Sequence, residues 1–156
     1  MKKLISILIV AVLLISTACA ADAKRSTKGV LSMKLNIQID NGTSKHTLTA
    51  TLYDNSSSRA LVELLQKGSV TIDMHDYSNF EKVGDLPVTL PRNDTPTDTD
   101  AGDLILYLGK RFVIYYDKNS WDFTPLGKVD DVTKTELKKI LGKGNVTAVL
   151  SVEENL

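Results

Sequence analysis

The carboxyl and imidazole side chains of Asp73, His75 and Asp76 form the first group in this sequence that could do chemistry. Together they could bind a metal ion or act in acid–base catalysis, because zinc takes nitrogen and oxygen ligands and histidine titrates near neutral pH. In an extended strand, however, Asp73 and His75 face one side and Asp76 faces the other, so at most two of the three converge. We therefore interpret them as a solvent-facing strand end and predict no metal site.

A second acidic group, Asp98, Asp100 and Asp103, resembles an oxygen-rich calcium loop. A calcium loop also needs a bidentate carboxylate at a fixed later position, whereas this chain runs directly into an apolar stretch at Leu104. We interpret the group as an acidic surface loop in which Asp103 caps a turn. No nucleophile with a partner base and no glycine-rich phosphate loop is recognisable in the sequence. It therefore predicts no catalytic residue and no cofactor.

Aromatic residues are densest between Tyr115 and Phe123, where four of the chain's nine fall. Strand aromatics in a small β domain mostly pack in the core. Trp121 and Phe123, however, lie beyond the predicted strand, where a loop could present them to a ligand. We take Trp121, Tyr116 and Phe123 as ligand-binding candidates, together with Arg59 at the start of a predicted helix.

Most of the chain shows period-two alternation of apolar and polar residues, which is typical of half-buried strands. We therefore expect strands to position these candidate residues. The turn dipeptide Asn41-Gly42 joins the first two alternating segments into a predicted hairpin. About eight strands and two short helices are expected, which is typical of a closed or nearly closed barrel with a mainly β fold. Seven of the strands are predicted near 33–39, 46–53, 70–74, 80–83, 104–108, 112–116 and 146–152, and the helices near 59–67 and 133–141.

The segment from Gly84 to Gly102 departs from this pattern, since it contains Pro87, Pro91 and Pro96 among many Asp and Thr residues. We predict a long loop with little regular structure. Loops of this length in compact domains are usually functional or mobile. A binding groove is therefore expected along the barrel, near this loop and Trp121.

The first 20 residues have the pattern of a secretory signal peptide: Lys2 and Lys3, then an apolar run from Leu4 to Ile15, then small residues. A run of about 12 residues is shorter than the roughly 20 that a bilayer-spanning helix needs. Residues 21–29 are small or charged and predict a flexible tether. The folded domain is expected to occupy residues 30–156.

Cys19, the single cysteine, leaves two processing routes open. Ala18 and Ala20 suit ordinary cleavage before Ala21, whereas the residues from Ser16 to Cys19 resemble a lipoprotein box in which Cys19 is lipidated. Either route predicts an extracytoplasmic protein, secreted or lipid-anchored to the cell envelope, with membrane contact through that anchor alone. The 19 basic and 19 acidic residues give no net charge, so no positive electrostatic field is expected to attract nucleic acid.

Four strings occur in an order and at spacings that resemble the small bacterial cyclophilin-like proteins, over about residues 33–152. They are Gly84-Asp85-Leu86-Pro87, residues 101–107 (AGDLILY), residues 112–116 (FVIYY) and residues 126–129 (LGKV). The resemblance implies a closed eight-stranded cyclophilin-like barrel with two helices, in agreement with the expected strands.

The resemblance does not imply peptidyl-prolyl isomerase activity. True cyclophilins carry an arginine in a Phe-His-Arg setting and a Gln-Phe-Phe strand, and neither motif occurs here. Arg59 begins a helix and Arg111 begins an apolar strand. We therefore expect a module that binds an unknown small molecule or peptide, with a divergent isomerase acting on exported proteins as the alternative.

Overall fold

The first alternating segments form the expected hairpin in the computed structural model, which describes residues 33–152. Strand β1 (Lys34–Asp40) pairs antiparallel with β2 (Lys45–Leu52), and Ile37 lies opposite Leu48. Leu35, Ile37 and Ile39 are fully buried, and the polar residues between them are at least partly exposed. This follows from the geometry of a strand, in which successive side chains point to opposite faces.

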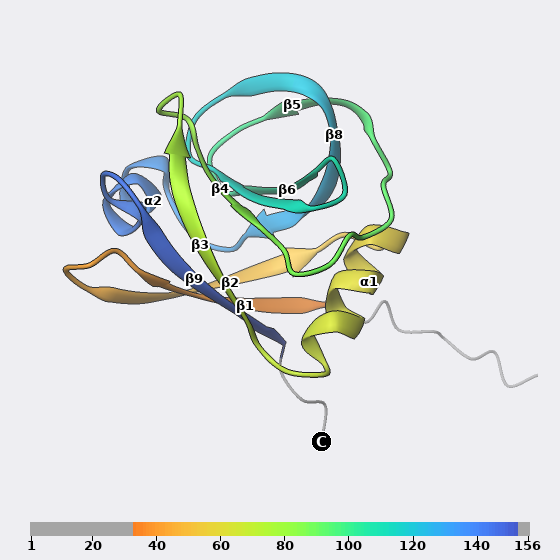
Figure 1. Ribbon diagram of the computed structural model, residues 1–156. Helices are drawn as coiled ribbons and strands as arrows, with labels where there is room; N and C mark the ends of the chain where they lie inside the picture. The colour runs from red at the N-terminus through yellow and green to blue at the C-terminus, as the bar shows by residue number, and fades with distance from the viewer. Residues whose placement is uncertain (1–32, 153–156) are drawn as a thin grey trace, which may run out of the picture. The chain divides into compact units, whose positions relative to one another are not determined.

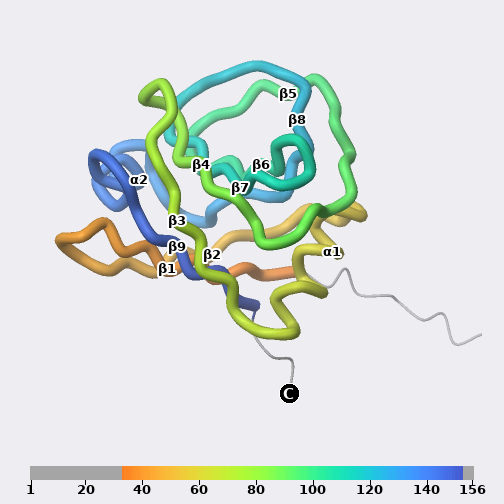
Figure 2. Tube along the Cα trace, viewed as in Figure 1, coloured from red at the N-terminus to blue at the C-terminus, as the bar shows by residue number. Residues whose placement is uncertain are grey.

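Residues 33–152 form nine strands and two short helices. The strand order is β2-β1-β9-β3-β4-β7-β6-β8-β5, and β2 also pairs with β8. Eight strands therefore close into a ring, which confirms the predicted mainly β fold with eight strands; the ninth strand, β5, lies outside the ring. The helices lie on opposite sides of the ring in Figure 1 and Figure 2. The remaining elements are α1 (Ser56–Leu65), β3 (Val70–Tyr77), β4 (Glu81–Asp85), β5 (Thr95–Thr99), β6 (Asp103–Tyr107), β7 (Arg111–Tyr115), β8 (Asn119–Val129), α2 (Lys134–Leu141) and β9 (Val146–Val152).

Both helices begin at side-chain caps. The Asn55 side chain accepts a hydrogen bond from the Ser58 backbone N–H at 2.9 Å, so α1 begins three residues before the predicted start at Arg59. Thr133 and Glu136 form a reciprocal capping box at the start of α2, close to the predicted boundary. Neither of these helices is long and apolar enough to cross a membrane.

Strand β7 separates the buried side chains into two clusters. Phe112 and Ile114 point into the ring and join its main hydrophobic core. Val113 and Tyr115 point outward and form a second cluster with residues of β4, β6 and β8. The outer face of the sheet is therefore apolar and covered around β7, where a simple half-buried strand would face water.

Two paired strands, which we call the arm, cover this outer cluster, and the sequence did not predict them. The first half of β8 (residues 119–123) leaves the ring and pairs with β5, with Thr97 opposite Trp121. The register between β6 and β8 shifts at Leu104 and Ile105, where the strand bends. Figure 1 shows this β5–β8 arm arching on the side of β4 and β6. Two predictions are thus wrong: the segment 84–102 contains the end of β4 and all of β5, and Trp121 lies in a strand. Pro96 is compatible with a strand because β5 is an edge strand.

Candidate functional site

A cleft of about 750 Å³ lies on the outer face of the ring. Its walls come from β3, β4, β6 and β7 and from the β8 half of the arm. The volume falls within the roughly 300–1,000 Å³ that is usual for small-molecule sites.

The antiparallel register arranges the side chains of the cleft in three rows that cross the sheet. The rows are Tyr77, Glu81 and Tyr115; His75, Val83 and Val113; Asp85, Arg111 and Tyr107. The middle row is apolar at its centre, and the two outer rows each carry a charged group. A ligand on this surface would therefore meet an apolar strip flanked by polar contacts.

Aromatic rings pack against one another beneath the cleft. The Tyr115 ring stacks on Phe80 with centroids 6.0 Å apart, and it lies 5.7 Å from the ring of Phe123. Phe123 also contacts Tyr107 edge-on at 6.0 Å. Trp121, in contrast, is 66% exposed. An exposed tryptophan beside a covered aromatic floor is a favourable anchor for a ligand, because its indole ring combines apolar area with a hydrogen-bond donor.

The polar end of the cleft is a short relay of hydrogen bonds. Glu81 is only 9% exposed and accepts a hydrogen bond from Tyr115, whose hydroxyl oxygen accepts one from the Asn119 side-chain amide at 3.3 Å. Burial raises the pKa of Glu81 above its ordinary 4.5, and the Tyr115 hydrogen bond and the nearby His75 offset only part of this. Burial and the bond to Glu81 also raise the pKa of Tyr115, so its hydroxyl stays protonated as a donor.

The opposite end of the cleft carries an arginine. The Arg111 side chain lies 3.7 Å from a carboxyl oxygen of Asp85, and its guanidinium lies 6.0 Å from the centre of the Tyr107 ring. Both charged residues are more than half exposed, so solvent screens their attraction and the pair leaves Arg111 free to contact a ligand.

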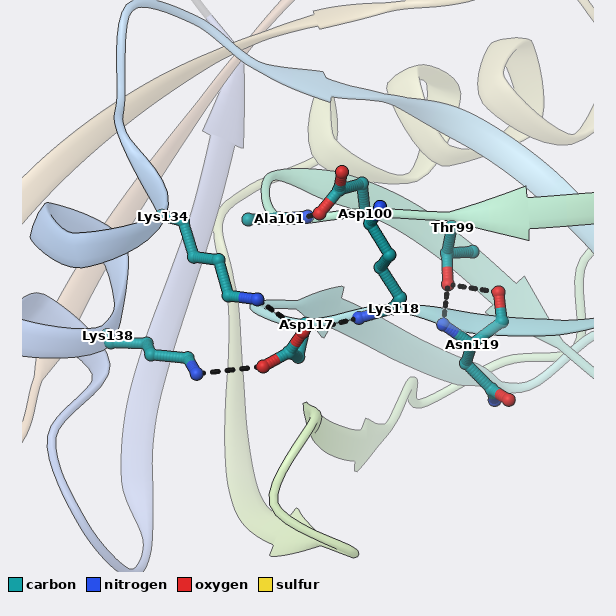
Figure 3. A network of polar contacts seen from close by, with 8 residues as sticks. All are labelled: Thr99, Asp100, Ala101, Asp117, Lys118, Asn119, Lys134 and Lys138. Atoms are coloured by element: carbon teal, nitrogen blue, oxygen red, sulfur yellow. Dashed lines mark hydrogen bonds and ion pairs between the residues drawn. The ribbon is translucent and has the colours of Figure 1, made fainter.

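Contacts at its base hold the arm in place (Figure 3). The Thr99 hydroxyl donates to the Asn119 carbonyl at 3.0 Å and accepts from the Asn119 N–H at 3.1 Å. Asp117, in the turn before β8, pairs with Lys134 and with Lys138, at 2.8 Å for the latter. The hydrogen bonds from these two lysines lower the pKa of Asp117 well below its usual range. The turn that starts the arm is thereby tied to α2.

The model of the cyclophilin-like family matches residues 38–151, a span that contains every residue of the cleft. The chain belongs to the cyclophilin-like family. This confirms the resemblance seen in the sequence. No match to this chain was found among curated proteins.

Two of the four candidates predicted for ligand binding line the cleft of this cyclophilin-like domain, namely Trp121 and Phe123. Tyr116 does not, because it alternates with Tyr115 and points into the ring, where it is 9% exposed. Arg59 lies on α1 beside Asp54, away from the cleft. The lipidation candidate, Cys19, and the predicted signal peptide and tether lie outside the described residues.

Sequence reasoning missed Glu81, Arg111 and Tyr115 as residues of the cleft. Strand alternation did place Asp73 and His75 on one face and Asp76 on the other, and the first two do line the cleft while Asp76 does not. Across residues 33–152, no three His, Cys, Asp or Glu side chains are arranged to hold a metal ion. Nothing in the sequence marked Glu81 as a residue of the cleft, because a charged residue at the start of a strand is usually solvent-exposed.

A second hollow, of about 380 Å³, adjoins the cleft on the arm. Trp121 lines both, and the second is otherwise formed by polar residues of β5 and β8 and by Pro96. The candidate surface of this cyclophilin-like domain is therefore elongated, with the tryptophan between its two parts.

Proposed function

We propose that this cyclophilin-like domain binds a peptide in extended form, along the cleft and across Trp121 onto the arm. The observation that carries the proposal is the position of Trp121 between two hollows, of about 750 and 380 Å³. A small molecule would fill one of them, whereas an extended peptide of several residues, at about 3.3 Å each, can reach both. Trp121 would then lie at the centre of the interface, where anchoring residues usually concentrate the binding energy.

The floor and the ends of the cleft supply complementary contacts. Trp121 and Tyr77, whose rings are both more than half exposed in the cleft, offer apolar area for one or two side chains of the peptide. Arg111 and the Asn119 amide can bind main-chain carbonyl groups, because both carry N–H donors. Apolar area with a few fixed polar groups is the usual composition of a binding site.

We predict that Trp121→Ala weakens peptide binding by about 30-fold or more, because truncation of a central tryptophan commonly costs about 2 kcal/mol or more. The purified protein is first screened on an array of immobilised 12-residue peptides of varied composition. Affinities for the peptides that bind are then measured by calorimetry. Trp121 is the chain's single tryptophan, so its fluorescence also reports directly on occupancy.

Tyr53→Ala is the matched control, because Tyr53 is an aromatic residue that is 45% exposed and lies outside both hollows. We expect it to bind as the unaltered protein does. Equal affinities for Trp121→Ala and the unaltered protein would show that the peptide does not use this surface.

A second candidate function is peptidyl-prolyl isomerisation, and the presence of Arg111 in the same cleft favours it. An arginine N–H that bonds to the proline amide nitrogen would reduce the conjugation that creates the barrier of about 18–20 kcal/mol. A turnover assay with a proline-containing peptide tests this, with Arg59→Ala as the control arginine outside the cleft. The binding proposal expects no acceleration. Acceleration lost in Arg111→Ala but kept in Arg59→Ala would make catalysis the primary function.

We also propose that the domain acts outside the cytoplasm, with residues 1–20 as an export signal. Support comes from the basic, apolar and small segments of those residues. The intact mass of the mature protein distinguishes the two processing routes, since cleavage before Ala21 leaves no cysteine, while lipidation leaves a modified Cys19 at the N-terminus. In the lipidated case, Cys19→Ser should release the protein from the membrane fraction.

A further inference from the structure

The two hollows are strongly acidic. Five carboxylates line them, against a single arginine, Arg111. The carboxylates are those of Asp73, Glu81 and Asp85 in the cleft and of Asp98 and Asp122 on the arm. Low-dielectric walls strengthen the field of such a cluster, so the surface favours a cationic ligand.

Internal pairing neutralises little of this charge. Of the ion pairs found in residues 33–152, one involves these five carboxylates: the Asp85–Arg111 pair at 3.7 Å. Asp73 accepts a hydrogen bond from the Thr147 hydroxyl at 3.0 Å, and Asp98 accepts one from Ser120 at 2.5 Å. These donors are neutral, so the carboxylates keep their net charge.

Aromatic rings lie among the carboxylates. Tyr77, Tyr107, Tyr115, Trp121 and Phe123 all line the larger cleft. The face of an aromatic ring carries partial negative charge, so it attracts an ammonium or guanidinium group. Rings also cover the alkyl stem of a lysine or arginine side chain. Carboxylates and aromatic rings together thus suit a cation on an apolar stem.

We infer that the cleft selects peptides that carry lysine or arginine, with one basic side chain held beside Glu81. This inference rests on the proposed peptide-binding function and names the class of peptide. Glu81 is the decisive group because it is nearly buried, and a buried carboxylate is costly unless a cation or several donors accompany it. A ligand cation would supply the missing partner.

The side chains around Glu81 leave its carboxylate available to bind a ligand cation. His75 and Tyr77 face it from β3, Tyr115 from β7 and Asn119 from β8. The neighbouring cation, Lys82, points to the opposite face of β4 and pairs with Asp76 at 2.8 Å. The raised pKa of Glu81 means that a cation binds best once this carboxyl has ionised, so affinity for a basic peptide should rise as the pH rises above 4.5.

The test compares three versions of one array-selected peptide, with arginine, citrulline or glutamate at the same position. Citrulline keeps the shape of arginine and removes its charge. For the purified protein we expect the arginine peptide to bind about tenfold or more tightly than the citrulline peptide, because a hydrogen-bonded charged contact is worth about 1.5–3 kcal/mol. The glutamate peptide should bind most weakly.

Glu81→Gln should remove most of the preference for arginine over citrulline, together with the rise in affinity with pH. Glu63→Gln is its control, because Glu63 is exposed on α1 and lies outside both hollows. Asp122→Asn changes an exposed carboxylate on the arm and leaves the buried residues of the cleft as they are. It should give a smaller loss of the preference for arginine over citrulline.

Each outcome has a distinct meaning. Equal binding of the arginine and citrulline peptides, unchanged by Glu81→Gln, overturns the charge selection and leaves the peptide-binding function intact. Tighter binding of the glutamate peptide also overturns it. Failure of every arrayed peptide to bind overturns the proposed function and this inference with it.

Discussion

Replacing Asp76 with asparagine should lower the free energy of unfolding by about 3–5 kcal/mol, because it leaves a buried ammonium group without its anionic partner. Lys82 is fully buried, and its Nζ lies 2.8 Å from the Asp76 carboxyl. The same carboxyl accepts hydrogen bonds from the Tyr116 hydroxyl at 2.8 Å and from the Gly144 N–H at 3.0 Å. Lys82 also donates to the carbonyl of Gly142 at 3.3 Å. One pair therefore joins β3, β4, the end of β7 and the turn before β9. Urea denaturation followed by circular dichroism measures the loss.

Two further variants isolate the cause. Adding Lys82→Met to Asp76→Asn removes the buried charge and should recover much of the lost stability, since replacing a whole buried pair by apolar groups is often neutral. Asp40→Asn breaks an exposed pair with Lys45 at 3.6 Å and should cost at most about 1 kcal/mol. A loss in Asp76→Asn no larger than in Asp40→Asn would mean that Lys82 finds other partners.

The effect of Asp76→Asn should also depend on pH. Burial raises the pKa of Asp76, but hydrogen bonds from Lys82, Tyr116 and Gly144 outweigh burial and hold it below the ordinary 3.8. A carboxyl whose pKa is lowered on folding stabilises the protein above its unfolded-state pKa, and this contribution is lost as the pH falls through the folded-state value. The difference between the unaltered protein and Asp76→Asn should be full above about pH 5 and shrink in stronger acid.

Gly127→Ala should destabilise the domain by about 3 kcal/mol, because the added methyl group meets backbone that cannot move aside. Gly127 lies opposite Leu52 where β8 closes the ring against β2. A Cβ at this position would lie 2.3 Å from the Thr51 carbonyl oxygen and 2.8 Å from the Leu52 Cα. The close approach of the two strands thus requires a residue without a side chain.

The measurement is again urea denaturation, with Thr49→Ala as the control at an exposed position on β2. Thr49→Ala should change the free energy of unfolding by about 0.5 kcal/mol or less. If Gly127→Ala were as stable as Thr49→Ala, strands β2 and β8 would have to separate without cost, and the ring would not depend on this contact.

Strand alternation predicted much of the fold because most strands of the ring have one face in the main core. Alternating segments on either side of Asn41-Gly42 predicted the hairpin that β1 and β2 form. The prediction of a loop at 84–102 was wrong, since prolines and acidic residues suit an edge strand as well as a loop. The prediction that Trp121 lies in a loop was also wrong, because the half of β8 that contains it pairs with β5 in the arm and not with a strand of the ring.

The sequence by itself determined the family, the mainly β class, the ring of strands and the aromatic character of residues 115–123. The tertiary structure alone decided which side chains share the cleft. Glu81, Arg111 and Trp121 come from three strands, and the pairing of β4 with β7 and the bend in β8 bring them to one surface. Local periodicity specifies the face on which a side chain lies, but pairing between distant strands depends on the closure of the whole sheet, and no short stretch of sequence encodes that.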